Sequence, residues 1–165
     1  NNQRTNRPNS NSGLCPRALR DLYLRAIEIC VRRARPAAVM TSYNLINGVH
    51  TSESVELLEV ILRREWGFDG LVMTDWVVDG MTHSDMKHPR ATAAATIKAG
   101  NELFMPGGET DREDLLAALE RGSAGHGASG RTEPEDEGAA LTRGELEKQA
   151  ARVIRSAWRL AGSEQ

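Results

Sequence analysis

A carboxylate and an indole stand side by side in this sequence at Asp75 and Trp76, and they are the residues best suited to chemistry. They follow the continuous apolar run Leu71-Val72-Met73, which is typical of a parallel strand that is covered on both faces. In parallel α/β folds, the side chains at the carboxyl ends of strands carry the chemistry. A carboxylate in such a place can act as a nucleophile. We therefore predict that Asp75 is a nucleophile.

The alternative for Asp75 is structural, because an aspartate after a strand often caps a helix or forms a turn. Two neighbours favour chemistry. The Trp76 indole offers an apolar platform on which the face of a sugar can stack. Tyr43 ends the preceding predicted strand, and side chains at the ends of adjacent parallel strands lie about 5 Å apart. A tyrosine hydroxyl that donates to the Asp75 carboxylate would keep it ionised and oriented.

Helices and strands that alternate along the chain must position these side chains. Pro16 suits the first turn of a helix, and Pro36 ends the same helix. Short connections between alternating elements indicate right-handed βα units and a parallel sheet. The spacing of apolar residues predicts helices at residues 16–34, 53–65, 90–99 and 111–121, and strands at 37–43, 70–75 and 102–105.

A final helix begins at a capping-box pattern, in which Thr142 is followed three residues later by Glu145. Its apolar residues recur at helical spacing, so one face is predicted to pack inward. The residues of this predicted inward face are Leu146, Ala150, Val153, Ile154, Ala157 and Ala161.

Three strands are too few for a closed barrel, which needs about eight. The sequence therefore predicts an α/β fold that is part of a (β/α)8 barrel, about its last three βα units, cut from a longer chain. A small flavodoxin-like sheet is the alternative, although such sheets usually have five strands. Residues 1–121 would form the partial barrel, residues 122–141 a flexible linker or insertion rich in Gly, Ser, Glu and Pro, and residues 142–165 the C-terminal helix.

Composition excludes several classes of partner and cofactor. The net charge is −2 with 27% charged residues, so neither a nucleic acid nor a membrane is indicated as a partner. The basic cluster at residues 32–35 lacks the interleaved aromatics of a nucleic-acid site. No glycine-rich phosphate motif and no metal-ligand spacing is present, so we predict no cofactor and no metal. Cys15 and Cys30 do not make a disulfide framework.

Other ionisable residues have weaker claims to the site. His50 and His83 lie in loops that leave strand ends, so each either faces the same site or is a polar surface residue. Glu102 stands near a strand start, at the end opposite the predicted chemistry, and is not a candidate acid or base. Glu53, Glu56 and Glu59 are predicted to be solvated on a helix flank. Lys87 and His88 form either a surface-loop pair before Pro89 or part of the site entrance.

Several segments together resemble glycoside hydrolase family 3, the β-glucosidase and β-xylosidase family. They follow the order and spacing of that family over roughly residues 1–121. The matching segments are Asn-Asn-Gln-Arg-Thr-Asn-Arg at residues 1–7, Arg-Ala-Leu-Arg-Asp-Leu-Tyr-Leu at 17–24, Val-Met-Thr-Ser-Tyr-Asn at 39–44 with Asn47-Gly48, Glu-Trp-Gly-Phe-Asp-Gly at 65–70, Thr-Asp-Trp at 74–76, and Ala-Gly-Asn-Glu-Leu at 99–103.

The resemblance implies a retaining, exo-acting β-glycosidase. Such an enzyme hydrolyses terminal non-reducing β-linked sugars of a glycoside or oligosaccharide, and the covalent glycosyl-enzyme intermediate would form on Asp75. Trp76 would line the subsite for the non-reducing sugar, Tyr43 would lie near the nucleophile, and Arg7 would bind sugar hydroxyls. β-Xylosidase specificity is the alternative, because both activities share the nucleophile motif.

A retaining mechanism needs a second carboxyl group about 5–5.5 Å from the nucleophile. In the family this acid/base is typically a Glu of the next domain, and a sugar-binding Lys-His pair precedes the residue that matches Arg7. We therefore expect these 165 residues to be an inactive fragment, whose partners are the first part of the barrel and the following domain of the same chain. A different barrel enzyme that uses Asp75 as a general base is the remaining alternative.

Overall fold

The computed structural model describes residues 9–76, 87–124 and 139–162. Its centre is a parallel sheet in the order β2–β5–β6, formed by β2 (Ala38–Met40), β5 (Leu71–Trp76) and β6 (Leu103–Met105). Val39 pairs with Val72 across β2 and β5, and Met73 pairs with Leu103 across β5 and β6. The three predicted strands and their parallel arrangement are confirmed.

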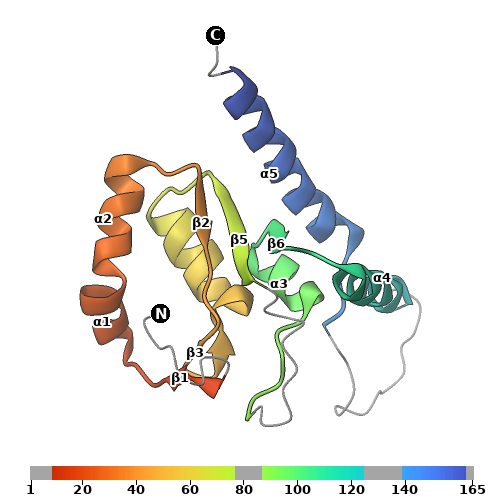
Figure 1. Ribbon diagram of the computed structural model, residues 1–165, viewed down its shortest axis with the longest axis horizontal. Helices are drawn as coiled ribbons and strands as arrows, with labels where there is room; N and C mark the ends of the chain where they lie inside the picture. Colours follow the sequence, from red (N-terminus) through yellow and green to blue (C-terminus); the bar gives the residue numbers. More distant parts are fainter. Residues whose placement is uncertain (1–8, 77–86, 125–138, 163–165) are drawn as a thin grey trace.

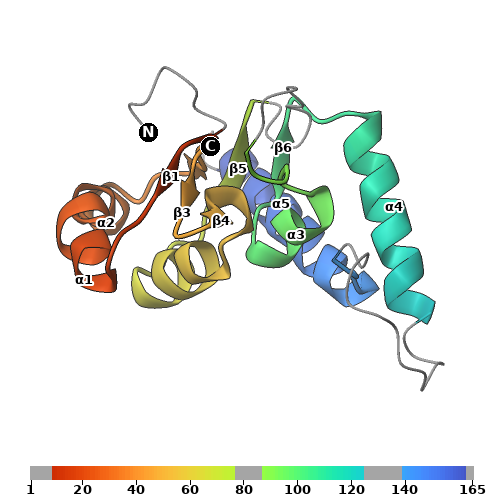
Figure 2. The same ribbon diagram turned by 90° about the horizontal axis from the view of Figure 1, so that it is seen from below.

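Helices flank the sheet, with α1 and α2 on the side of β2 and α4 on the far side of β6 (Figures 1 and 2). The predicted helix at 16–34 consists of α1 (Pro16–Ala18), the π-helical turn η2 (Leu19–Tyr23) and α2 (Arg25–Ala34). The other helical elements are the 3-10 turn η3 (Thr51–Glu53), the π-helical η4 (Glu56–Glu65), α3 (Ala93–Ala99), α4 (Glu109–Ala124) and α5 (Arg143–Gly162). None of these described helices is both long enough and apolar enough to cross a bilayer.

A second, small sheet was not predicted. It contains β1 (Asn11–Ser12), β3 (Leu45–Ile46) and β4 (Val49–His50), and it lies where the sequence predicted only loop. Asn47 and Gly48 have positive φ angles of 52° and 84°, which is the geometry of a two-residue hairpin turn. An Asn-Gly dipeptide favours such a turn, and the strands on either side of it were not predicted.

The main core lies between β5, η4 and α2. Val72 of β5 is fully buried and packs in one cluster with Val31, Leu58, Leu62, Phe68 and Ala99. The first helix contributes less than its sequence pattern suggested, because Leu22, Tyr23 and Ile27 are exposed. Cys15 and Cys30 are free and exposed.

The predicted inward face of α5 is correct only in part, since Leu146 packs against the buried cluster around Ile97 and Val153 is half-buried. The capping box is present, since the Thr142 N–H donates to Glu145 at 2.8 Å and the Glu145 N–H donates to the Thr142 hydroxyl at 3.3 Å. The helix nevertheless buries Gln149 and Ser156 and leaves Ile154 exposed. Buried carboxylates of neighbouring elements bind the polar side of α5, so polar contacts rather than apolar area decide which face turns inward.

Candidate active site

Asp75 lies at the carboxyl end of β5, the central strand of the parallel sheet. Side chains alternate along the strand: Val72 and Thr74 are buried, while Met73 and Asp75 are half-buried on the other face. One carboxylate oxygen of Asp75, Oδ1, accepts a hydrogen bond of 2.7 Å from the Trp76 N–H. A half-buried, oriented carboxylate at this end of a strand is suited to attack a bound substrate.

Tyr43 lies beside the end of β5, as predicted from the adjacent strands. The chain reaches it three residues after β2 ends, and the Tyr43 ring is buried against Ala91. Its hydroxyl donates to the backbone carbonyl of Trp76 at 2.7 Å. Tyr43 therefore holds the backbone next to Asp75, while the described carboxylate contact comes from the Trp76 N–H.

Trp76 combines a fixed backbone with an exposed side chain. Its side chain is 56% exposed, so the indole face is open to a ligand. The pairing of β5 with β6 shifts register between Met73 and Trp76, and the Thr74 hydroxyl accepts the Met105 N–H at 2.9 Å within this irregular stretch. Register irregularities of this kind often lie next to active sites, where they redirect a side chain.

Two candidates from the sequence, Arg7 and His83, lie outside the described residues, as does most of the predicted linker at 122–141. His50 is not a surface residue. It is buried in β4, and its Nε2 lies 2.8 Å from the carbonyl oxygen of Pro89. This contact joins the small sheet to the segment before α3. Lys87 is exposed, whereas its neighbour His88 is half-buried.

The prediction that Glu59 is solvated is wrong, because it is buried together with Glu102 in an ionic cluster. Glu53 is also only partly exposed, since it accepts the Thr92 N–H at 2.7 Å. Glu56 is exposed, as predicted. The available sequence signal was the four-residue spacing of Glu59 and Arg63, which places the two charges on one face of the helix.

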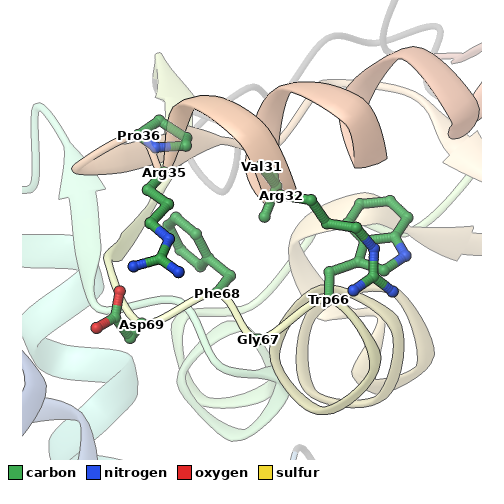
Figure 3. A pocket seen from close by; sticks show the side chains of 8 residues that line it. All are labelled: Val31, Arg32, Arg35, Pro36, Trp66, Gly67, Phe68 and Asp69. Atoms are coloured by element: carbon green, nitrogen blue, oxygen red, sulfur yellow. The ribbon is translucent and has the colours of Figure 1, made fainter.

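Two surface hollows are lined by residues other than Asp75, Tyr43 and Trp76. One, of about 600 Å³, is a mainly apolar groove between the first helix and β2. The other, of about 430 Å³, lies at the amino ends of β2 and β5, and Figure 3 shows Arg35 extending toward Asp69 across it. Chemistry in parallel sheets occurs at the opposite, carboxyl ends of the strands, so this second hollow is not the candidate site.

We expect Tyr43→Phe to lower the free energy of unfolding of the full chain by about 1 kcal/mol, because it removes the donor to a partly buried backbone carbonyl. Urea denaturation followed by circular dichroism measures the change. Tyr23→Phe is the matched control, since Tyr23 is 60% exposed and its loss of a hydroxyl should be neutral. Equal effects of the two substitutions would show that the Tyr43 bond does not stabilise this site.

Comparison with known families and proteins places the site in context. Residues 7–128 match the family model described as glycosyl hydrolase family 3 N terminal domain. The chain is 44% identical over 120 residues to an exo-α-(1→6)-L-arabinopyranosidase of Bifidobacterium longum, covering 73% of this chain and 14% of that protein. It is 40% identical over 124 residues to a β-glucosidase of Ruminococcus albus, covering 74% of this chain and 13% of that protein.

Solved structures agree with the family match. The fold superposes on β-glucosidase 3B from Thermotoga neapolitana in complex with α-D-glucose with a TM-score of 0.73 and 30% identity, over 94% of this chain and 19% of that one. A GH3 β-glucosidase from Bifidobacterium adolescentis gives a TM-score of 0.66 at 33% identity, over the same shares of the two chains. The chain thus spans about a seventh of the curated relatives and about a fifth of these structures.

Proposed function

Because this chain belongs to glycosyl hydrolase family 3, we propose that it carries the nucleophile of a retaining, exo-acting β-glycosidase that is β-glucosidase-like. The observation that carries the proposal is the place of Asp75. It lies at the carboxyl end of the central parallel strand, beside an exposed indole whose backbone Tyr43 holds. The relatives named as β-glucosidases support a substrate with a terminal non-reducing β-linked sugar.

The proposed reaction has two steps on Asp75. The ionised carboxylate attacks the anomeric carbon, the glycosidic bond breaks, and the leaving oxygen takes a proton from a second carboxylic acid. Water then attacks the anomeric carbon of the glycosyl-enzyme intermediate, the same group takes its proton, and the bond to Asp75 breaks, so two inversions leave the configuration retained. The Trp76 N–H bond to Oδ1 orients the carboxylate and leaves its other oxygen for attack, while the indole stacks on the sugar.

Other parts of the site are proposed to come from a longer polypeptide. A retaining enzyme needs its acid/base about 5–5.5 Å from the nucleophile. Glu102 lies at the amino end of β6, opposite the carboxyl end of β5, so it is excluded from that role. Residues 1–121 would be the last βα units of a (β/α)8 barrel, residues 122–141 an insertion, and residues 142–165 a helix that leads onward. Arg7 would bind sugar hydroxyls.

A specific observation supports a second substrate class, the α-L-arabinopyranosides. The relative from Bifidobacterium longum is named for exo-α-(1→6)-L-arabinopyranoside cleavage and is 44% identical to this chain. β-Xylosidase specificity is the further alternative, since the proposed nucleophile would serve both. We propose that the 165 residues alone are inactive, since no second carboxylate is assigned to Asp75 among the residues that the structure describes.

Mechanism-based labelling tests the proposal. The longest natural polypeptide that contains residues 1–165 is incubated with 2,4-dinitrophenyl 2-deoxy-2-fluoro-β-D-glucoside, whose leaving group departs without acid catalysis. We expect one fluoroglycosyl adduct per molecule, mapped by mass spectrometry to Asp75 and absent from Asp75→Asn. An adduct on another carboxylate would reject Asp75 as the nucleophile. Comparing the labelling rates of the fluorinated glucoside, xyloside and arabinopyranoside ranks the three substrate classes.

A further inference from the structure

A buried cluster of charged side chains lies at the amino ends of β5 and β6, opposite Asp75. It joins η4, the residue before β6, and α5 through Glu59, Arg63, Glu102, Lys148 and Arg152. The Glu102 side chain is 0% exposed, and Arg63 is nearly as buried. Buried ion pairs are expensive to desolvate and are weak evidence for stability alone, so their place in the fold is informative.

Glu102 forms hydrogen bonds with both the N–H and the carbonyl of Val72 in β5. Its Oε2 accepts the Val72 N–H at 2.6 Å, and its own backbone N–H donates to the Val72 carbonyl at 2.9 Å. Val72 lies three residues before Asp75 on the same strand. Farther along, the Met105 N–H donates to the Thr74 hydroxyl at 2.9 Å. The stretch of β5 that precedes Asp75 is therefore hydrogen-bonded at two points, to Glu102 and to Met105 of β6.

Two arginines hold the Glu102 carboxylate in place. Its Oε1 accepts from Arg63 and, at 3.1 Å, from Arg152 of α5. Arg63 also donates to the carbonyls of Gly70 at 3.1 Å and Gly100 at 3.4 Å, which precede β5 and β6. Burial raises the pKa of Glu102, and the opposing Val72 N–H, Arg63 and Arg152 contacts favour the charged carboxylate. The bonds to β5 thus depend on both arginines.

Arg152 extends the same connection to α5. Its Nη1 donates to Glu59 at 2.9 Å and to Gln149 at 2.8 Å, in addition to Glu102. Burial opposes ionisation of Glu59, but the hydrogen bonds from Arg152 and Lys148 outweigh it and lower the pKa of Glu59. These contacts explain why α5 turns its polar face inward, and they connect a helix distant in sequence to the strand that carries Asp75.

We propose that Glu102 is a positioning residue for Asp75, and that Arg152 of α5 holds it in that role. The pair fixes β5 along the sheet and so sets where the Asp75 carboxylate meets the anomeric carbon. This inference rests on the proposed function of Asp75. Reaction rates are sensitive to placement, since a misplacement of about 1 Å can cost about 100-fold. α5 is accordingly part of the catalytic scaffold.

The test measures Asp75 attack directly, as the rate of labelling by the fluorinated glucoside in the longest natural polypeptide containing this chain. In Glu102→Gln the amide oxygen still accepts an N–H, but the charge that pairs with both arginines is lost. We expect labelling to slow by about 10-fold or more while the dissociation constant for glucose stays within about threefold. A folded Glu102→Gln protein that labels at the wild-type rate would overturn the inference.

A second pair of variants keeps the test decisive if Glu102→Gln fails to fold. Arg152→Gln removes one of the two cations that hold the Glu102 carboxylate against β5 and keeps the Arg63 contact, and we expect it to slow labelling by about 10-fold. Arg152→Lys restores a cation and should recover most of the rate. Arg143→Gln is the control, because Arg143 pairs with Glu147 on the exposed side of α5 and should label normally.

The two proposals fail differently. Wild-type labelling that does not map to Asp75 rejects the proposed nucleophile. Wild-type labelling at Asp75 together with an unchanged rate in Arg152→Gln rejects only the positioning role.

Discussion

Asp75→Ala is expected to lower kcat for an aryl β-glucoside by about three orders of magnitude or more in the longest natural polypeptide that contains this chain. The substitution removes the atom that would form the covalent intermediate, so the reaction loses its two-step route. Because Asp75 is only half-buried and comes after the buried residues Val72 and Thr74 of β5, the fold should persist. Steady-state kinetics, with circular dichroism to verify folding, measure both effects.

Asp69→Ala is the matched control for this experiment. Asp69 precedes β5 at its other end and pairs with Arg159 of α5, far from the proposed chemistry. Its replacement should leave kcat within about twofold of the wild-type value, since an exposed ion pair contributes little to the stability of the fold. A near-normal kcat in Asp75→Ala would move the nucleophile to another residue, whatever the behaviour of the control.

Gly70→Ala is expected to lower the free energy of unfolding of the chain by about 3 kcal/mol. A Cβ atom at this position would lie 2.4 Å from the Ala37 carbonyl oxygen and 2.8 Å from Cζ of Phe68. The same Ala37 carbonyl accepts the Leu71 N–H at 2.9 Å, where β2 and β5 first meet. The added methyl group would therefore separate the two strands at the start of the sheet. Urea denaturation measures the loss.

Gly144→Ala is a comparison in which we expect the free energy of unfolding to change in the opposite direction. Gly144 lies in the first turn of α5, and no other atom lies within 4 Å of the position its Cβ would take. Alanine favours the helix over glycine by up to about 1 kcal/mol, so this variant should be slightly more stable than the wild type. If Gly70→Ala were as harmless as Gly144→Ala, the close approach of β2 and β5 would be incorrect.

The proposed site and the ionic cluster occupy opposite ends of one strand. Asp75 and Trp76 end β5, whereas Val72, three residues before Asp75, is bonded by Glu102. The placement of the carboxylate at one end thus depends on the buried charges at the other end. Arg152 connects these charges to α5. Substitution of Arg152 in α5 is therefore expected to affect a reaction that its side chain does not touch.

The sequence by itself determined what depends on neighbouring residues. Apolar runs and the spacing of apolar residues predicted the parallel strands and most helices. The Asn47-Gly48 dipeptide favours a tight turn, and Thr142 with Glu145 predicted the start of α5. Each of these features follows from local backbone preferences or from a hydrogen bond over three residues. The place of Asp75 after an apolar run followed in the same way.

Only the tertiary structure decided which side of each element is buried. The apolar residues of α5 lie largely outside because Arg152 and Gln149 meet Glu59, Glu102 and the carbonyl of Ile97, residues that lie 50 or more positions away. Trp158 of the same helix is 81% exposed for that reason. The burial of His50 and the Tyr43 bond to Trp76 are likewise contacts over more than 30 residues. Helical and strand periodicities carry no information about such distant partners, because charge pairing and hydrogen bonding between remote segments outweigh the local apolar pattern.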